Sequence, residues 1–271
     1  MAESQPKFDQ PPVIETVLSA QFARLPNFSS ALTGWFWKKY LSDEWVKSKD
    51  AIRLDDQFER FNDESLWIPT VPFRIRSASE FENERVQIIR KDEERMIQIQ
   101  DTRFTLNWRK RSGPYPTYEI FLPEFNDVFE RFKAFVRDNE LGDFSLNQWE
   151  VTYINYIPKG DLWQTVNDWK TILPGIYIPV VAGGGAIESL GNNWRYVLAE
   201  KRGRLYVSLQ LARIESRPPD SLVLQFTARG AVEDERGWSL ESGFKLGHLS
   251  IVQTFAAITS KDAQTHWRRT S

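Results

Sequence analysis

Residues 85–109, with the sequence RVQIIRKDEERMIQIQDTRFTLNWR, decide the fold of this chain. Alternating side chains on both sides of residues 92–94 predict a β-hairpin, and the chain then continues into a third strand. Because successive side chains of a strand face opposite sides of a sheet, the third strand has one apolar face and one polar face. The apolar face carries Phe104, Leu106 and Trp108 beside Thr102, and the polar face carries Arg103, Thr105, Asn107 and Arg109. What the polar face contacts is the functional question that this stretch raises.

Similar patterns predict further strands and helices on both sides of the hairpin. In the first half we expect strands over residues 13–22, 51–61 and 73–76, a helix from about 29 to 41, and a long helix near Pro123 that continues to Val136. In the second half we expect strands over 148–157, 194–201, 205–214 and 222–229, with helices over 165–173 and 246–258.

Both halves therefore have the order strand, helix, several antiparallel strands, long helix. This order predicts an α+β protein with two tandem β-α-β(3–4)-α halves, over residues 1–143 and 144–271, that form one compact unit. It is similar to the tandem-repeat topology of the TATA-box-binding-protein fold, in which helices cover one face of a curved sheet and the other face is open. The analogy concerns the fold alone and implies nothing about DNA.

The composition is that of a globular protein, with 41% hydrophobic and 27% charged residues among 271. The net charge of −2 gives no general attraction to nucleic acid or anionic membranes. No apolar run approaches the roughly 20 residues that a membrane span requires, and residues 1–10 lack the apolar region of a secretory signal. We therefore expect a cytoplasmic protein with no membrane association.

Few residues indicate catalysis or metal binding. The absence of cysteine excludes disulfides, thiolate catalysis and cysteine-ligated zinc. His248 and His266 have no adjacent carboxylate motif, so they do not predict a metal site. A packing or capping role for His248 competes with a general base. The glycines of residues 183–185 lack the lysine of a phosphate-binding loop. We expect no catalytic residue, no metal and no cofactor.

The polar face of the sheet is the candidate binding surface. It combines hydrogen-bond donors, acceptors and an aromatic ring with little lysine or glutamate, which suits a peptide, a nucleotide or a nucleic-acid strand. The candidate residues are Glu15, Arg103, Thr105, Asn107, Arg109, Tyr206, Ser208, Gln210, Gln225 and Thr227. Arg109 also begins the basic run 109–111, which is able to hold phosphate. A polar face that only contacts water is the competing interpretation.

Motifs along most of the chain resemble a sporadically distributed prokaryotic family of uncharacterised proteins. They are Pro11-Pro12-Val13-Ile14-Glu15, the hairpin residues Arg85-Val86-Gln87, Asp92, Arg95 and Gln98, residues 104–107, Pro114-Tyr115-Pro116, Tyr153-Ile154-Asn155, and His248, Ile251, Phe255, Ile258-Thr259 and Trp267 near the C-terminus. Two features depart from the family: Tyr156 replaces an arginine, and residues 108–112 are more basic.

The resemblance implies no reaction, but a patchy distribution is typical of accessory genes in bacterial defence or toxin–antitoxin systems. We therefore expect a non-enzymatic binding or regulatory protein that uses an open polar sheet face to hold a protein partner. The alternatives are a nucleotide or small-molecule sensor in the same groove, or an enzyme acting on nucleic acid or nucleotides. The sequence does not indicate the oligomeric state.

Overall fold

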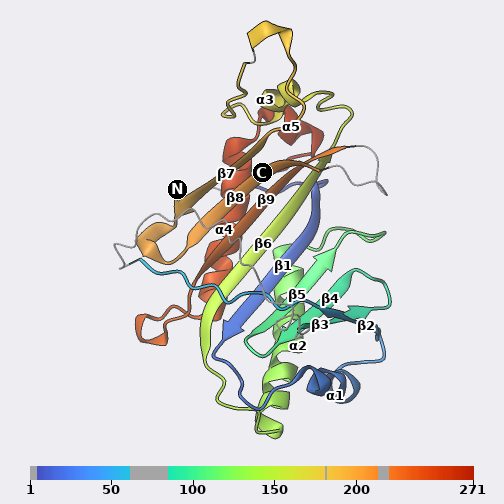
Figure 1. The fold of residues 1–271 in the computed structure, drawn as a ribbon, viewed down its shortest axis with the longest axis vertical. Helices are drawn as coiled ribbons and strands as arrows, with labels where there is room; N and C mark the ends of the chain where they lie inside the picture. Colours follow the sequence, from blue (N-terminus) through green and yellow to red (C-terminus); the bar gives the residue numbers. More distant parts are fainter. Residues whose placement is uncertain (1–4, 62–84, 181, 213–219) are drawn as a thin grey trace. The chain divides into compact units, whose positions relative to one another are not determined.

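A computed structural model describes residues 5–61, 85–180, 182–212 and 220–271 of the chain. These residues form an α+β fold with nine strands in one sheet and five α-helices (Figure 1). The α+β class is confirmed. The strand expected at residues 73–76 lies outside the described residues.

The first half of the chain contributes five strands and two α-helices. They are β1 (Val13–Phe22), α1 (Ser30–Tyr40), β2 (Trp45–Ala51), β3 (Arg85–Arg90), β4 (Arg95–Gln100), β5 (Arg103–Arg109) and α2 (Tyr118–Asp138). The strand expected over residues 51–61 is wrong, because β2 ends at Ala51 and residues 52–60 pair with no strand.

The second half contributes four strands and three α-helices. They are β6 (Leu146–Pro158), α3 (Trp169–Ile172), β7 (Gly191–Val197), β8 (Arg204–Ala212), β9 (Ser221–Ala231), α4 (Leu240–Ile258) and α5 (Lys261–His266). The hydrogen-bonded strand order is β2-β3-β4-β5-β1-β6-β9-β8-β7, so β2 and β7 are the edge strands of the sheet.

The chain divides into two compact units. The hairpin unit consists of Leu18–Trp149 and Gly230–Leu240, and the terminal unit consists of Met1–Val17, Glu150–Arg229 and Glu241–Ser271. The division lies within β1 and β6, so each of these strands belongs partly to each unit.

Phenylalanines of α2 form the core of the hairpin unit. Phe125, Phe129 and Phe132 recur at helical spacing, so they lie on one side of α2 and are buried. Phe104 of β5 meets all three rings, with centroids 5.1–5.9 Å apart. Phe36 of α1 packs edge-on against Phe132 at 5.6 Å. This packing confirms the predicted apolar face of β5.

In the terminal unit, α4 covers the apolar side of the strands. Leu205, Val207 and Leu209 of β8 are buried at alternate positions. Phe226 of β9 meets Phe255 of α4 with ring centroids 6.1 Å apart. The opposite side chains of β8 and β9 therefore form the polar face of this unit.

Candidate functional site

The polar face of β5 is buried, although the sequence predicted an open surface. Arg103, Thr105 and Asn107 retain only 6%, 4% and 3% of their exposure. Ser19 of β1 and Thr105 share a hydrogen bond of 2.7 Å between their hydroxyl groups. The expectation of an open face is therefore wrong for the hairpin unit, because other parts of the chain cover these side chains.

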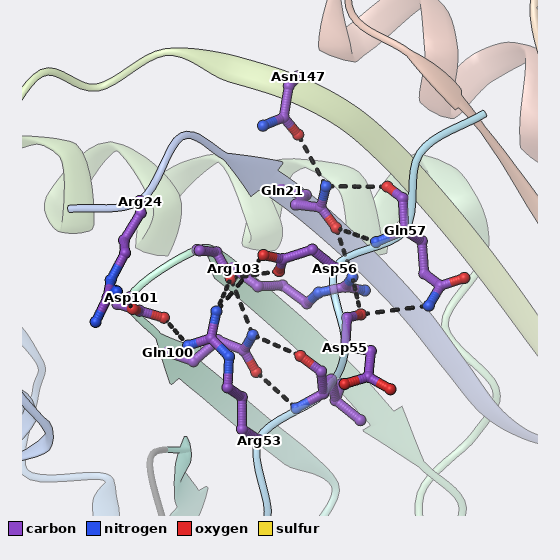
Figure 2. A network of polar contacts seen from close by, with 12 residues as sticks. Gln21, Arg24, Arg53, Asp55, Asp56, Gln57, Gln100, Asp101, Arg103 and Asn147 are labelled. Carbon is purple, nitrogen blue, oxygen red and sulfur yellow. Dashed lines mark hydrogen bonds and ion pairs between the residues drawn. The ribbon is translucent and has the colours of Figure 1, made fainter. Parts of the chain in front are cut away.

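Residues 52–60, here called the covering segment, lie over the Arg103 end of this face and are held by glutamine side chains (Figure 2). The Gln100 amide accepts from the backbone N–H of Leu54 at 3.1 Å and donates to the Leu54 carbonyl at 3.0 Å. The Gln21 amide does the same with Gln57, at 2.9 and 3.0 Å. A primary amide carries one acceptor oxygen and N–H donors, so it can satisfy the backbone as a neighbouring strand would.

A third glutamine and an arginine complete the hold on the backbone. The Gln148 oxygen accepts from the N–H of Glu59 at 3.1 Å. Arg103 donates to the Asp55 carbonyl at 3.3 Å and to the Gln21 oxygen at 2.7 Å (Figure 2). Most of these bonds reach the backbone of the covering segment and not its side chains.

Side chains of the covering segment add charged and hydroxyl contacts. Arg53 pairs with Asp101, and Asp56 accepts from the Thr102 hydroxyl at 2.6 Å (Figure 2). Asp101 also pairs with Arg24 at 2.9 Å. These contacts tie the segment to the turn between β4 and β5.

Asn107 belongs to a second buried polar chain in the hairpin unit. Gln98 donates to the Asn107 oxygen at 2.8 Å and accepts from Arg85 at 2.7 Å. Burial, followed by the positive charge of Arg103, lowers the pKa of Arg85. The predicted binding residue Asn107 therefore bonds within the protein.

Arg109 of β5 is half-buried, and it contacts the turn between β3 and β4. Its guanidinium donates to the Glu93 carbonyl at 3.3 Å, and the neighbouring Arg111 lies 3.9 Å from the Glu93 carboxylate. Two arginines of the basic run 109–111 therefore interact with Glu93 in this turn.

The predicted site residues of the terminal unit are more accessible. Tyr206, Ser208, Gln225 and Thr227 are half-buried, as is Glu15 of β1, and Gln210 is exposed. The antiparallel register places Tyr206 opposite Thr227 and Ser208 opposite Gln225. These four side chains therefore form one contiguous polar patch.

An arginine and an aromatic ring lie beside this patch. The guanidinium of Arg229 lies 4.5 Å from the ring centroid of Tyr206, and its nitrogen lies 3.5 Å from the Glu150 carboxylate. The hydroxyl of Thr227 bonds to that of Thr152 at 2.9 Å. We define the terminal polar face as these residues together with the predicted residues of β8 and β9: Glu150, Thr152, Tyr206, Ser208, Gln210, Gln225, Thr227 and Arg229.

The hold on the covering segment depends on glutamines that the sequence analysis did not select. Gln21, Gln100 and Gln148 are absent from the predicted site residues. The sequence did contain one indication of these residues. Strand positions that usually carry charged side chains when they face solvent carry neutral amides and few lysines here.

His248 has a packed environment. It is buried, its Nδ1 lies 2.8 Å from the Tyr153 hydroxyl, and its Nε2 lies 2.6 Å from the Gln5 amide.

Among the described residues, no group of three histidine, cysteine or acidic side chains is placed to hold a metal ion. In the same part of the chain no helix is long and apolar enough to cross a membrane.

Comparison with known proteins adds no family. No model of a protein family matches this chain, and a search of curated proteins finds no match.

Proposed function

We propose that the chain is a binding protein whose terminal polar face holds an extended, acidic segment of a protein partner. The observation that carries this proposal is the reciprocal bonding of Gln21 and Gln100 to the backbone of the covering segment. In the hairpin unit, the protein already uses a polar sheet face to hold an extended peptide.

The terminal polar face has the same kinds of groups in a more accessible setting. Gln225, Ser208 and Thr227 offer an amide and hydroxyls, as Gln21, Ser19 and Thr105 do in the hairpin unit. All three are half-buried, whereas their counterparts are buried. An extended peptide across β8 and β9 would therefore find donors and acceptors for its backbone.

Charge favours an acidic partner. Arg195 stands opposite Tyr206, and Arg204 stands opposite Arg229. Glu150 lies 3.5 Å from Arg229. Positive charge from these arginines attracts carboxylates and speeds their association.

The proposal includes a structural duplication with the topology of the TATA-box-binding-protein fold. Its support is the element order, since β1, α1, hairpin strands and α2 correspond to β6, α3, β7 to β9 and α4. If the halves correspond, β5 matches β9, so their polar faces share an ancestral role. The family resemblance supports a partner from a defence or toxin–antitoxin system.

The test uses a fluorescent synthetic peptide with the sequence of residues 52–60, IRLDDQFER. The covering segment already occupies the hairpin unit at high effective concentration, so added peptide is directed to the terminal unit. We expect saturable binding that weakens about tenfold in the double variant Ser208→Ala with Gln225→Ala, because two hydrogen bonds are lost.

Three controls separate the alternatives. Gln253→Ala repeats the Gln225→Ala change, from glutamine to alanine, at an exposed position of α4. It should leave peptide binding unchanged. A peptide carrying Asp55→Lys and Asp56→Lys should bind more weakly. No binding, or binding that ignores the double variant, would refute the proposal. Tighter binding of ATP at the same residues would favour the nucleotide sensor instead.

A further inference from the structure

Strand β7 is an exposed edge of the sheet. All of its residues are exposed except Trp194, which is half-buried, and Tyr196 and Val197 retain 44% and 59% of their exposure. Among the strands that the structure describes, β8 is its one neighbour in the sheet order. Within the described part of the chain, one side of the β7 backbone therefore has no strand beside it.

The register identifies the backbone groups that face outward. Leu198 donates to the Gly203 carbonyl at 2.9 Å, and β7 and β8 continue from this pair without a shift. In an antiparallel ladder, residues that bond to the neighbour alternate with residues whose N–H and C=O point away. Trp194 and Tyr196 thus bond toward β8, and Asn193, Arg195 and Val197 present their backbone groups to the free edge.

The opposite edge strand has the features that prevent edge pairing. β2 carries Lys47, Lys49 and Asp50, and its register shifts between Trp45 and Lys47. Charges and bulges on an edge discourage the addition of another strand. β7 has one charge, Arg195, and a regular register with β8.

We propose that a second copy of this chain pairs antiparallel with β7, around a twofold axis at Trp194. Trp194 is the midpoint of Gly191–Val197, so this register overlaps the strand over its whole length. It brings together outward-facing residues, as a ladder requires: Asn193 stands opposite Arg195 of the partner subunit, and Gly191 stands opposite Val197 of the partner subunit.

Charge and aromatic packing single out this register and this occupant. A shift that centres the axis on Arg195 would place two arginines opposite each other, which is unfavourable. With the axis at Trp194, each arginine meets a neutral asparagine, and the two indoles form a cross-strand pair at a position without hydrogen bonds, where side chains approach most closely. Tyr196, bonded to the Trp194 indole N–H at 2.9 Å, extends this aromatic contact.

Sedimentation equilibrium of the full chain tests the proposal. We expect a reversible monomer–dimer equilibrium. Arg195→Pro should abolish the dimer without unfolding the protein, because the removed N–H points away from β8. Arg195→Ala keeps that N–H and should still dimerise. Unchanged circular dichroism of the proline variant shows that the fold is intact.

Charge variants test the register and the identity of the occupant. In the dimer, each Asn193→Glu carboxylate stands opposite Arg195 of the partner subunit, so the twofold axis gives two such pairs. The dissociation constant of the dimer should therefore fall by about threefold or more, and Asn193→Lys should raise it similarly. A monomer at every concentration would overturn the proposal, as would a dimer that responds to neither change. A chain that stays monomeric and binds peptide along β7 would also overturn it, because the edge would then hold other extended chains.

Discussion

The side-chain amide of Gln21 and the backbone of Gln57 form a closed pair of hydrogen bonds, one accepted and one donated, at 2.9 and 3.0 Å. Gln21 thereby supplies the hydrogen bonds that a neighbouring strand would otherwise supply to the backbone of Gln57. The same oxygen accepts from Arg103, and the same nitrogen donates to Asn147 at 3.0 Å. One buried side chain therefore connects β1, β5, the start of β6 and the covering segment.

Gln21→Ala should destabilise the protein by about 2–4 kcal/mol, because it leaves several buried polar groups with fewer partners. Urea unfolding measures the change. Gln253→Ala, an equal change on an exposed helix position, should stay within about 0.5 kcal/mol of the parent. Equal stability of the two variants would contradict the role assigned to Gln21.

Arg103→Glu combined with Asn107→Ala should lower the thermal midpoint strongly. The new carboxylate would face the Gln21 oxygen and the Asp55 carbonyl, both acceptors, and a buried charge without a partner costs about 3–5 kcal/mol. Calorimetry provides the measurement, and an unchanged midpoint would mean that this face is open. Ser208→Ala on the terminal polar face is the contrasting variant and should cost little.

Hydrogen exchange should reveal the covering segment. The amides of Leu54, Gln57 and Glu59 are held by glutamine side chains, so they should exchange slowly although they lie outside every strand. In Gln21→Ala, the Gln57 amide should lose protection first. Fast exchange at all three positions in the parent protein would argue against a stable covering segment.

Low pH should weaken the turn before α3. The backbone N–H groups of Thr165 and Gln164, followed by the Thr165 hydroxyl, lower the pKa of Asp168 from its ordinary 3.8. A carboxyl group whose pKa is lower in the folded protein than in the unfolded protein stabilises the fold at any pH above the unfolded pKa. This contribution disappears as the pH falls through the folded pKa. The stability difference between the parent and Asp168→Asn should therefore be present at neutral pH and absent in strong acid. A difference that persists in acid would show that Asp168 does not act through its charge.

Periodicity predicted the elements and the two faces of the strands. Phe125, Phe129 and Phe132 give α2 its helical spacing, and Phe104 with Leu106 gives β5 its apolar side. β7 was predicted three residues late, over 194–201, because Gly191, Asn192 and Asn193 have low strand propensity. Its pairing with β8 overrides that preference.

Periodicity did not reveal what covers the polar face of β5. An alternating pattern reports which side chains are polar, but a polar face is equally compatible with water and with a segment of the same chain. The pattern of residues 51–61 predicted a strand, but glutamine side chains hold the backbone of the covering segment in place of a neighbouring strand. The expectation of an accessible polar face therefore holds only in part, at half-buried residues such as Ser208, Gln225 and Thr227.

The most direct test of the account is to map the synthetic peptide IRLDDQFER onto the protein by NMR titration. The account predicts saturable shifts of the backbone amides of Ser208, Gln225 and Thr227, with little change at Leu54 and Gln57, whose face is already filled. Shifts confined to the hairpin unit, or none at either face, would contradict the claim that the terminal polar face holds an extended peptide.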